Sequence, residues 1–500
     1  MSAIPRTVDP VLALESTYAQ LPASFYSRVA PTPVAKPRLL RLNRALAERL
    51  GLDARALASE AGVAVLAGNR VPDGARPLAM AYAGHQFGGF VPSLGDGRAV
   101  LLGEVVDRDG VRRDIHLKGA GRTPYSRGGD GRAALGPVLR EYVISEAMAG
   151  LGIATTRALA MLETGEQVYR EVPQPGAILV RVAAGHVRVG TFEYFHHRGD
   201  SAAVRTLADH VIARHYPDCT QAANRYRALL DAVVARQADL IARWMLVGFI
   251  HGVMNTDNTS ITGETIDYGP CAFMDTFHPQ TVYSSIDHAG RYAYDQQARI
   301  GWWNLAQLAG CLQPLLADDE QAALASAREA VNAYAPAFES AWHAGLLAKI
   351  GLATTRDGDH ELAFALLSCM SAHKADFTNT FRGLCDAVAG DPASDAELRA
   401  LFDDAPAFDA WAVRWRARLA AEARGDAARR AAMRAVNPAY TPRNHRVQQA
   451  IDAAVLARDL APLEDLLTVV VAPFEDHPSL AALAAPPLPH EVVRQTFCGT

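Results

Sequence analysis

The pattern of apolar and polar positions predicts a strand-rich first part of the chain and a helical remainder. Residues 99–105 form a nearly unbroken apolar run, and residues 114–118 alternate between apolar and polar, as strands do. A second pair of strands is expected over 178–182 and 185–190. Helical spacing predicts helices over 39–52, 135–151, 201–216, 224–247, 296–316, 319–334, 337–351 and 396–436, with breaks at 355–359 and 390–394.

Composition narrows the class of protein. Half of the 500 residues are hydrophobic and 21% are charged, which is typical of a soluble globular chain. The formal net charge of -5 gives no general attraction to nucleic acid or to acidic membranes. No apolar run approaches the roughly 20 residues of a membrane span, and the first residues lack the order of a secretory signal, so a cytoplasmic protein is expected. The six cysteines include no Cys-x-x-Cys pair, which argues against structural zinc and a disulfide framework.

The middle of the chain carries two fragments of a phosphotransferase site. A kinase catalytic loop has the order His-x-Asp, four residues and Asn, and His251 and Asn258 keep that spacing. The position of the kinase aspartate holds Val253, which can neither accept a proton nor bind a cation. Asp267 begins Asp-Tyr-Gly, where kinases carry a metal-binding Asp-Phe-Gly. Each fragment alone would be an ordinary turn, but together they predict a nucleotide site with a metal pair and a new carboxylate, Asp257.

Lysine is rare in this chain, which draws attention to Lys118. Only four of the 49 basic residues are lysines, and Lys118 ends a predicted strand. In kinases such a lysine reaches the phosphates and pairs with a glutamate of the next helix. Glu141 and Glu146 lie on different faces of the helix predicted over 135–151, so only one can face Lys118. Glu141 is the preferred partner, Glu146 could be a solvated charge, and an exposed lysine at a strand end is the alternative for Lys118.

Two glycine-rich loops and two arginines are candidates for phosphate contacts. The turn 95–98 could bring backbone N–H groups close to a phosphate, with Arg98 adding donors, although a plain hairpin turn explains it equally well. The loop 119–132 is rich in glycine and arginine and longer than most loops of compact domains, which favours a function over a mobile surface loop. Arg181 and Arg188 interrupt apolar runs, so each is either buried beside an anion or exposed at a strand edge.

Together these segments resemble the selenoprotein O family of protein adenylyltransferases over nearly the whole chain. The matching blocks are 82–88, 94–98, 117–127, 251–258, 266–270 and 497–500. The resemblance implies an α+β fold that is bilobal like a protein kinase, binds ATP in a flipped orientation and transfers AMP to Ser, Thr or Tyr hydroxyls of proteins. The expected parts are an N-terminal extension (1–75), a kinase-like N-lobe with nucleotide-binding loops (76–195), a mostly helical C-lobe with the catalytic loop and metal site (196–460) and a C-terminal tail (461–500).

The resemblance also implies roles for individual residues. Asp257 would be the catalytic base, Asn258 and Asp267 would hold Mg²⁺ or Mn²⁺, and Glu141 would pair with Lys118. The residues expected to contact the nucleotide are Gly95, Gly97, Arg98, Lys118, Asp130, Gly131, Arg181, Arg188 and Asp267. Animal members carry a selenocysteine where this chain has Cys498, so a redox switch here must use thiols. Family members link the terminal cysteine to one in the activation segment, which suits Cys271.

Two other functions stay open from the residues alone. A protein or small-molecule kinase would transfer the γ-phosphate, against which Val253 argues. A pseudokinase scaffold would bind nucleotide without turnover, and it gives no reason to keep Lys118, Asn258 and Asp267 together. The expected partners are ATP and hydroxyl-bearing proteins, with neither nucleic acid nor a membrane, and a monomer is expected. With Mn²⁺, UTP is a second candidate donor.

Overall fold

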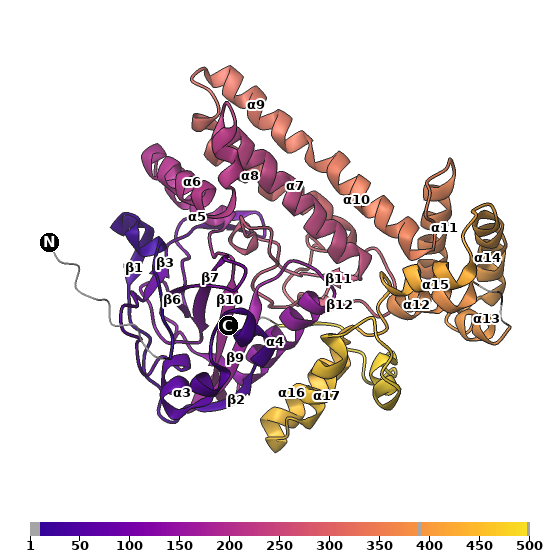
Figure 1. Ribbon diagram of the computed structural model, residues 1–500, viewed down its shortest axis with the longest axis horizontal. Helices are drawn as coiled ribbons and strands as arrows, with labels where there is room; N and C mark the ends of the chain where they lie inside the picture. The colour runs from indigo at the N-terminus through magenta and orange to yellow at the C-terminus, as the bar shows by residue number, and fades with distance from the viewer. Residues whose placement is uncertain (1–10, 389, 391, 498–500) are drawn as a thin grey trace.

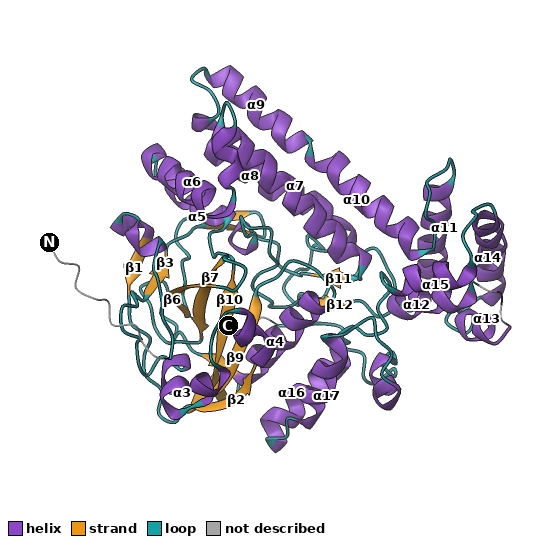
Figure 2. Cartoon of the chain, viewed as in Figure 1, coloured by secondary structure: helices purple, strands orange, loops and turns teal. Residues whose placement is uncertain are grey.

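The chain folds into a mixed α and β protein with a helical C-terminal part. The structure is a computed structural model that describes residues 11–388, 390 and 392–497. Its strands gather in one part of the molecule, and most of the later chain is helical (Figures 1 and 2). Two successive helices, α9 (Glu320–Asn332) and α10 (Tyr334–Lys349), lead away from the sheet toward the group that runs from α11 (Asp359–Ala372) to α15 (Asp426–Arg434) (Figure 1).

An eight-stranded antiparallel sheet forms the strand-rich part. Its order is β1 (Tyr26–Arg28), β3 (Leu78–Met80), β6 (Ala99–Val106), β7 (Arg112–Lys118), β10 (Pro173–Ala183), β9 (Arg157–Tyr169) and β2 (Arg38–Leu42), with β8 (Ala133–Ala134) paired to β10. Both edge strands, β1 and β2, come from the segment 1–75, which is therefore built into the sheet. Two smaller pairs are the hairpin of β4 (Gly84–Gln86) and β5 (Gly89–Val91), and β11 (Phe249–Ile250) with β12 (Ala272–Phe273).

The register of β7 against β10 separates polar from apolar side chains. Arg181 pairs with His116, and Lys118 follows two residues later on β7, so the three side chains share one face of the sheet. The other face is apolar and packs against the N-terminal helices. This cluster includes Ile115, Leu117, Val180 and Val182 of the sheet, with Leu46, Leu57 and Val65 of α1 (Arg44–Arg49), α2 (Ala54–Ala58) and α3 (Glu60–Leu66). Burial of the apolar face therefore directs the charged residues to the opposite side.

Three of the predicted helices begin at side-chain caps. The side chains of Asp200, Asn224 and Asp319 accept hydrogen bonds from the first backbone N–H groups of α6 (Ser201–His215), α7 (Arg225–Leu246) and α9. The other helices are α4 (Leu135–Gly150), α5 (Val189–His196), α8 (Gln297–Leu312), α12 (Phe377–Ala387), α13 (Pro392–Arg399), α14 (Ala405–Ala420), α16 (Asn444–Asp452) and α17 (Ala461–Val470). Within the described parts of the chain, every helix is too short or too polar to cross a membrane.

The strand predicted over 185–190 is wrong. The chain leaves β10 at Ala183, runs as a loop and begins α5 at Val189, with Arg188 at the N-cap position. Apolar and polar residues alternate in this segment, which suggested a strand with one solvated face. All residues from 185 to 190 are buried, however, so the alternation does not mark such a face here. This loop nevertheless brings Arg188 to the side of the sheet that carries Arg181 and Lys118, as the ion pairs below show.

Two predicted helices are also subdivided. The segment 39–52 contains the strand β2 followed by the short helix α1, because the side chain of Asn43 accepts from the backbone N–H of Leu46 and starts a helix there. The segment 396–436 holds the end of α13 and the separate helices α14 and α15. The break expected at 355–359 lies between α10 and α11, which begins at Asp359, whereas α13 already begins at Pro392, inside the break expected at 390–394.

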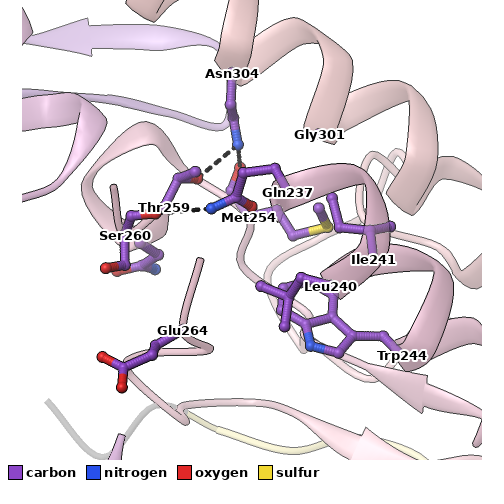
Figure 3. A pocket seen from close by; sticks show the side chains of 11 residues that line it. Gln237, Leu240, Ile241, Trp244, Met254, Thr259, Ser260, Glu264, Gly301 and Asn304 are labelled. Carbon is purple, nitrogen blue, oxygen red and sulfur yellow. Dashed lines mark hydrogen bonds between the residues drawn. The ribbon is translucent and has the colours of Figure 1, made fainter. Parts of the chain in front are cut away.

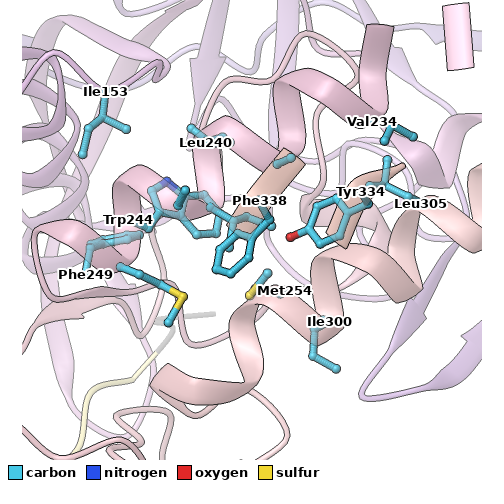
Figure 4. Close-up of a cluster of buried hydrophobic side chains, with 14 of the residues drawn as sticks. Ile153, Val234, Leu240, Trp244, Phe249, Met254, Ile300, Leu305, Tyr334 and Phe338 are labelled. Atoms are coloured by element: carbon cyan, nitrogen blue, oxygen red, sulfur yellow. The ribbon is translucent and has the colours of Figure 1, made fainter. Parts of the chain in front are cut away.

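A large apolar core joins α7, α8 and α10 beneath the loop that follows β11 (Figure 4). Trp244 of α7 packs edge-on against Phe249 of β11, with ring centroids 5.6 Å apart. Met254 lies in the loop itself and is buried in the same cluster. Aromatic rings bury large apolar areas and pack in defined geometries. This core therefore fixes the position at which the catalytic-loop segment, residues 251–258, begins.

Lys349, at the end of α10, is a lysine buried in this helical part. Its ammonium lies 4.3 Å from the ring centroid of Phe381, and burial lowers its pKa from the ordinary 10.5 to about 7. Between these two pH values the unfolded chain binds the proton and the folded chain does not. The free energy of unfolding should therefore rise with pH in this window.

We expect Lys349→Met to remove that pH dependence and to raise the free energy of unfolding at pH 7.5 by roughly 1–3 kcal/mol. Urea unfolding at pH 7, 8 and 9 measures both effects. Lys374→Met is the matched control, because the Lys374 side chain is 74% exposed and pairs with the exposed Asp403. An equal gain from both variants, or an unchanged slope in Lys349→Met, would contradict the assignment.

Candidate active site

One carboxylate, that of Asp267, gathers three cations from three separate elements. Its Oδ1 accepts from Lys118 Nζ at 3.1 Å and from an Arg181 guanidinium nitrogen at 2.6 Å. Its Oδ2 accepts from Arg188 at 2.5 Å. Glu141 of α4 completes the group, because it accepts from Lys118 at 2.5 Å and from Arg181 at 3.3 Å. Residues that are far apart in sequence therefore form one ion-pair network.

The network keeps Asp267 ionised. Burial alone would raise the pKa of Asp267, but Arg188, Arg181 and Lys118 hold it well below its usual range. The Asp267 side chain is still 20% exposed, whereas both arginine side chains are 2% exposed. Its backbone has φ of +61°, a left-handed conformation that a non-glycine residue rarely adopts, and such outliers are concentrated at functional sites.

Glu146, on the same helix as Glu141, has a different task. It is buried, and both of its oxygens accept from the guanidinium of Arg157, at 2.9 and 2.6 Å. Asn43 Nδ2 and the backbone N–H of Ala158 also donate to it. The interpretation of Glu146 as a solvated charge is therefore wrong, because its helical face packs against β9 and the N-terminal segment.

Two residues behind the cations were not singled out from the sequence. His116 Nδ1 lies 3.1 Å from Arg181, which can only donate, so the proton of a neutral His116 is on Nε2, where it faces Asp96 Oδ2 at 3.4 Å. Burial lowers the pKa of His116 although Asp96 opposes this. Asp96 also lies 3.9 Å from Arg188 and accepts from a backbone N–H at 2.9 Å. The available signal was the position of His116 two residues before Lys118 on one strand face.

The two glycine-rich loops pack on one another beside this network. A Cβ on Gly95 would lie 2.2 Å from the ring of Tyr125, and a Cβ on Gly97 would lie 2.9 Å from the Tyr125 carbonyl. Thr123 Oγ1 donates to the Asp96 carbonyl at 2.6 Å, and the Arg98 carbonyl accepts from the N–H of Gly119 at 2.7 Å. The structure thus joins the turn 95–98 to the loop 119–132 through close backbone contacts.

Asp130 and Gly131 lie at the far end of that loop. Asp130 accepts from Arg170 at 2.9 and 3.1 Å, and within the described part of the chain it forms no hydrogen bond with Lys118 or Arg181. Gly131 has φ of +68°, and a Cβ there would lie 2.0 Å from the Gly121 carbonyl, so it closes the loop on itself. Arg122 donates to carbonyls within the loop at 2.8 Å, which ties its charge to the loop backbone.

The catalytic-loop segment lies next to the network. Arg188 donates to the carbonyl of Asp257 at 2.7 Å, and the Asp257 side chain is buried. Burial, partly offset by Arg188, raises the pKa of Asp257 to about 6. Asn258 Nδ2 donates to the carbonyl of Val253 at 2.9 Å, which leaves Oδ1 as the oxygen that could face a cation. Val253 therefore contributes its backbone carbonyl to this loop, at the position where a kinase carries its catalytic aspartate.

Two helices hold this loop from behind, around a small pocket (Figure 3). Gln237 of α7 donates to the Ser260 carbonyl at 2.7 Å. Asn304 of α8 donates to the Met254 carbonyl at 3.0 Å and to Thr259 Oγ1 at 2.9 Å, as the dashed lines in Figure 3 show. These side-chain amides satisfy buried backbone carbonyls that no regular element pairs, and so they fix the loop conformation.

Comparison with known proteins assigns the family. Residues 10–471 match the family model described as "Protein adenylyltransferase SelO". The chain belongs to this family. Proteins named "Protein nucleotidyltransferase YdiU" from Rhodopseudomonas palustris strains HaA2 and BisB5 are 61% and 63% identical over 97% of this chain and 99% of each relative. One of the same name from Bradyrhizobium diazoefficiens is 61% identical over the same shares. The resemblance inferred from the motifs is therefore confirmed, and it identifies a family of nucleotidyltransferases.

The oxygen atoms that this SelO family member offers fit a divalent cation. Asp267 is ionised, and Asn258 presents an amide oxygen, which are the hard ligands that Mg²⁺ and Mn²⁺ prefer. In the described part of the chain, no three His, Cys, Asp or Glu side chains form a metal-binding group. A nucleotide-associated cation does not need one, because phosphate and water oxygens complete its coordination.

The C-terminal segment of the SelO family member lies against the chain that follows Asp267. Thr496 Oγ1 donates to the Pro270 carbonyl at 2.6 Å, and the Thr496 N–H donates to the Tyr283 carbonyl at 2.8 Å. Cys271 is buried next to this contact. Cys498, its expected redox partner, is outside the described residues, so a Cys271–Cys498 bond stays a prediction.

The roles of the two α4 glutamates lead to a stability prediction. We expect Glu146→Gln to lower the free energy of unfolding by roughly 3 kcal/mol, since it removes the buried carboxylate from the half-buried Arg157 charge. Urea unfolding measures the change. Glu163→Gln is the control, because its arginine partner, Arg38, is 57% exposed and the loss should stay below about 1 kcal/mol. Equal losses in the two variants would show that burial of the pair does not matter here.

Proposed function

We propose that this chain transfers AMP from ATP to the hydroxyl groups of Ser, Thr or Tyr side chains of other proteins. The observation that carries the proposal is the convergence of Lys118, Arg181 and Arg188 on Asp267, beside a loop in which Val253 replaces the kinase base. Membership of an adenylyltransferase family supports the same chemistry.

Three cations suit a pyrophosphate leaving group. When a hydroxyl oxygen attacks the α-phosphorus, the bond to the β-phosphate oxygen breaks and pyrophosphate leaves with the electron pair. Lys118, Arg181 and Arg188 would stabilise that charge, because guanidinium and ammonium groups bind phosphate oxygens with the geometry that they use here for carboxylate oxygens. A Mg²⁺ or Mn²⁺ ion held by Asn258 and Asp267 would act as a Lewis acid on the phosphate oxygens.

Asp257 is proposed to take the proton of the attacking hydroxyl. Its pKa of about 6 keeps it mostly ionised near neutral pH, yet makes it a stronger base than an ordinary aspartate. Its carbonyl accepts from Arg188, so the base and one phosphate-binding cation are tied together at 2.7 Å. The proton would pass from Asp257 to solvent after the product leaves.

The proposal includes a bilobal, kinase-like arrangement. The sheet of the segment 76–195 and the helical segment 196–460 would form two lobes with the nucleotide between them, and the segment 461–500 would be the tail that carries the redox candidate Cys498. Gly95, Gly97 and Arg98 lie next to Asp96 of the network, which supports a place beside the nucleotide. Asp130 and Gly131 would contact the nucleotide from the end of the loop 119–132 that Gly131 closes. ATP is the proposed donor in the cytoplasm, with UTP and Mn²⁺ as a second combination.

The position of the transferred label tests the function. With ATP, Mg²⁺ and lysate protein, we expect label on protein from α-labelled ATP and none from γ-labelled ATP. Asp257→Asn should lower the transfer rate by roughly 10²–10⁴-fold while ATP binding, measured by calorimetry, stays near the wild-type value. Transfer of the γ-label would assign a kinase, and ATP binding without transfer from any lysate would favour the pseudokinase scaffold.

Metal titration tests the proposed ligands. Removal of divalent cations with EDTA should abolish transfer, and Mg²⁺ or Mn²⁺ should restore it. Asn258→Ala should raise the metal concentration that gives half-maximal activity by about tenfold or more, because one of two protein ligands is lost. Asn304→Ala, which changes the loop only from behind, is the control and should shift the metal dependence less. The same metal dependence in wild type and Asn258→Ala would exclude Asn258 as a ligand.

A further inference from the structure

The β4–β5 hairpin is attached directly to the catalytic-loop segment. Three successive hairpin residues each bond one of the three successive residues 255–257, across about 170 positions of sequence. The bonds run from the His85 N–H to Thr256 Oγ1 (2.7 Å), from Gln86 Nε2 to Asp257 Oδ2 (3.3 Å) and from the Phe87 N–H to Asn255 Oδ1 (3.1 Å). The hairpin is therefore held in register with the residue proposed as the base.

A second set of contacts anchors the hairpin to α5. Glu193 accepts from Thr256 Oγ1 at 2.5 Å and lies 2.6 Å from His85 Nδ1, so one buried carboxylate joins the hairpin to the loop. The Ala83 N–H donates to the Gly190 carbonyl at 2.9 Å. A Cβ on Gly190 would lie 2.1 Å from the Ala83 carbonyl, so this close approach requires glycine. The hairpin is thus braced on both sides.

The two oxygens of the Asp257 carboxylate have different surroundings. Oδ2 accepts the hydrogen bond from Gln86, whereas Oδ1 is buried and has no hydrogen-bond partner among the described residues. Gly84 of β4 faces Oδ1 so closely that a Cβ there would lie 2.4 Å from it. A buried acceptor without a donor is unfavourable, so Oδ1 is the carboxylate oxygen whose hydrogen-bonding capacity is still unfilled.

We propose that Gln86 is a positioning residue for the transfer reaction: its amide donates to Oδ2 of Asp257 and holds the carboxylate in place, with Oδ1 unpaired against the bare α-carbon of Gly84. The inference rests on the proposed function. In the reaction the hydroxyl proton moves to the Asp257 carboxylate, the hydroxyl oxygen forms its bond to the α-phosphorus, and pyrophosphate leaves with the electron pair. Gln86 itself exchanges no proton.

The chemistry of the amide suits this task. A primary amide donates to Oδ2 without carrying a charge, so it orients the carboxylate and leaves its negative charge for the proton. A lysine or arginine at position 86 would bind Oδ2 more tightly and would make Asp257 a weaker base. Arg188, the cation whose charge lowers the pKa of Asp257, contacts the carbonyl of Asp257 rather than its carboxylate.

The test is a comparison of Gln86→Met with Gln449→Met. Both replace an amide that donates to a carboxylate with a side chain of similar length, but Gln449 pairs with Glu491 on an exposed part of the molecule. With α-labelled ATP, Mg²⁺ and lysate protein at fixed concentration, we expect Gln86→Met to lower kcat by about 10–100-fold with KM for ATP within twofold of wild type. Gln449→Met should leave both unchanged, and the thermal midpoints of the two variants should agree.

Gly84→Ala provides an independent test at Oδ1. The added methyl would overlap Oδ1 and displace the Asp257 carboxylate, so it should lower kcat at least as much as Gln86→Met, again with ATP affinity retained in calorimetry. Wild-type kcat in either variant, or a parallel loss of kcat, ATP affinity and thermal midpoint, would overturn the positioning role. If wild type itself transfers no α-label, the proposed function fails and this inference fails with it. If wild type transfers and the variants do too, only the inference fails.

Discussion

The site depends on the electrostatic balance at the Asp267 carboxylate. Three cations that are almost completely buried meet there, and burial of an unpaired charge is far more costly than burial of a paired one. Glu141 supplies the second carboxylate, so Lys118 and Arg181 each have two anionic partners. The sheet, α4 and the start of α5 must therefore keep their relative positions, because any displacement would leave a charge without its partner.

Apolar packing provides that fixed geometry. One face of the sheet is buried against the N-terminal helices, which forces the alternate residues of β7 and β10 to the other face. The core of α7, α8 and α10 supports the catalytic-loop segment from below, and side-chain amides of Gln237 and Asn304 hold its carbonyls. The charged residues need not stabilise the fold strongly, since hydrophobic burial positions them first.

The arrangement also supports the proposal that a carboxylate other than the kinase aspartate serves as the base. Loss of the carboxylate at Val253 is matched by a carboxylate at Asp257, which the hairpin of β4 and β5 encloses and whose backbone Arg188 contacts. The same arginine binds Asp267, so one guanidinium links the proposed base to the proposed metal ligand. Because the guanidinium group is planar and rigid, it fixes the distance between the Asp257 carbonyl and the Asp267 carboxylate.

The sequence by itself determined the elements whose signals are local. The helix 225–246 was predicted within one residue at each end, because Asn224 caps it and its apolar positions recur at helical spacing. Lys118 stands out because lysine is rare in this chain. The kinase-like loop and the Asp-Tyr-Gly motif stand out by the spacing of their residues. The segment 185–190 was misjudged, because alternation in a fully buried loop looks the same as in a strand.

Only the tertiary structure decided which charges are partners. Glu141 and Glu146 have the same chemistry and the same helix, and their tasks differ because one faces Lys118 and the other faces Arg157. Asp96 and Gln86 were not singled out from the sequence, since their importance comes from contacts with residues up to 171 positions away. Local patterns specify secondary structure, but the long-range packing of the sheet on its helices brings the charges together, and that packing cannot be deduced from spacing along the chain.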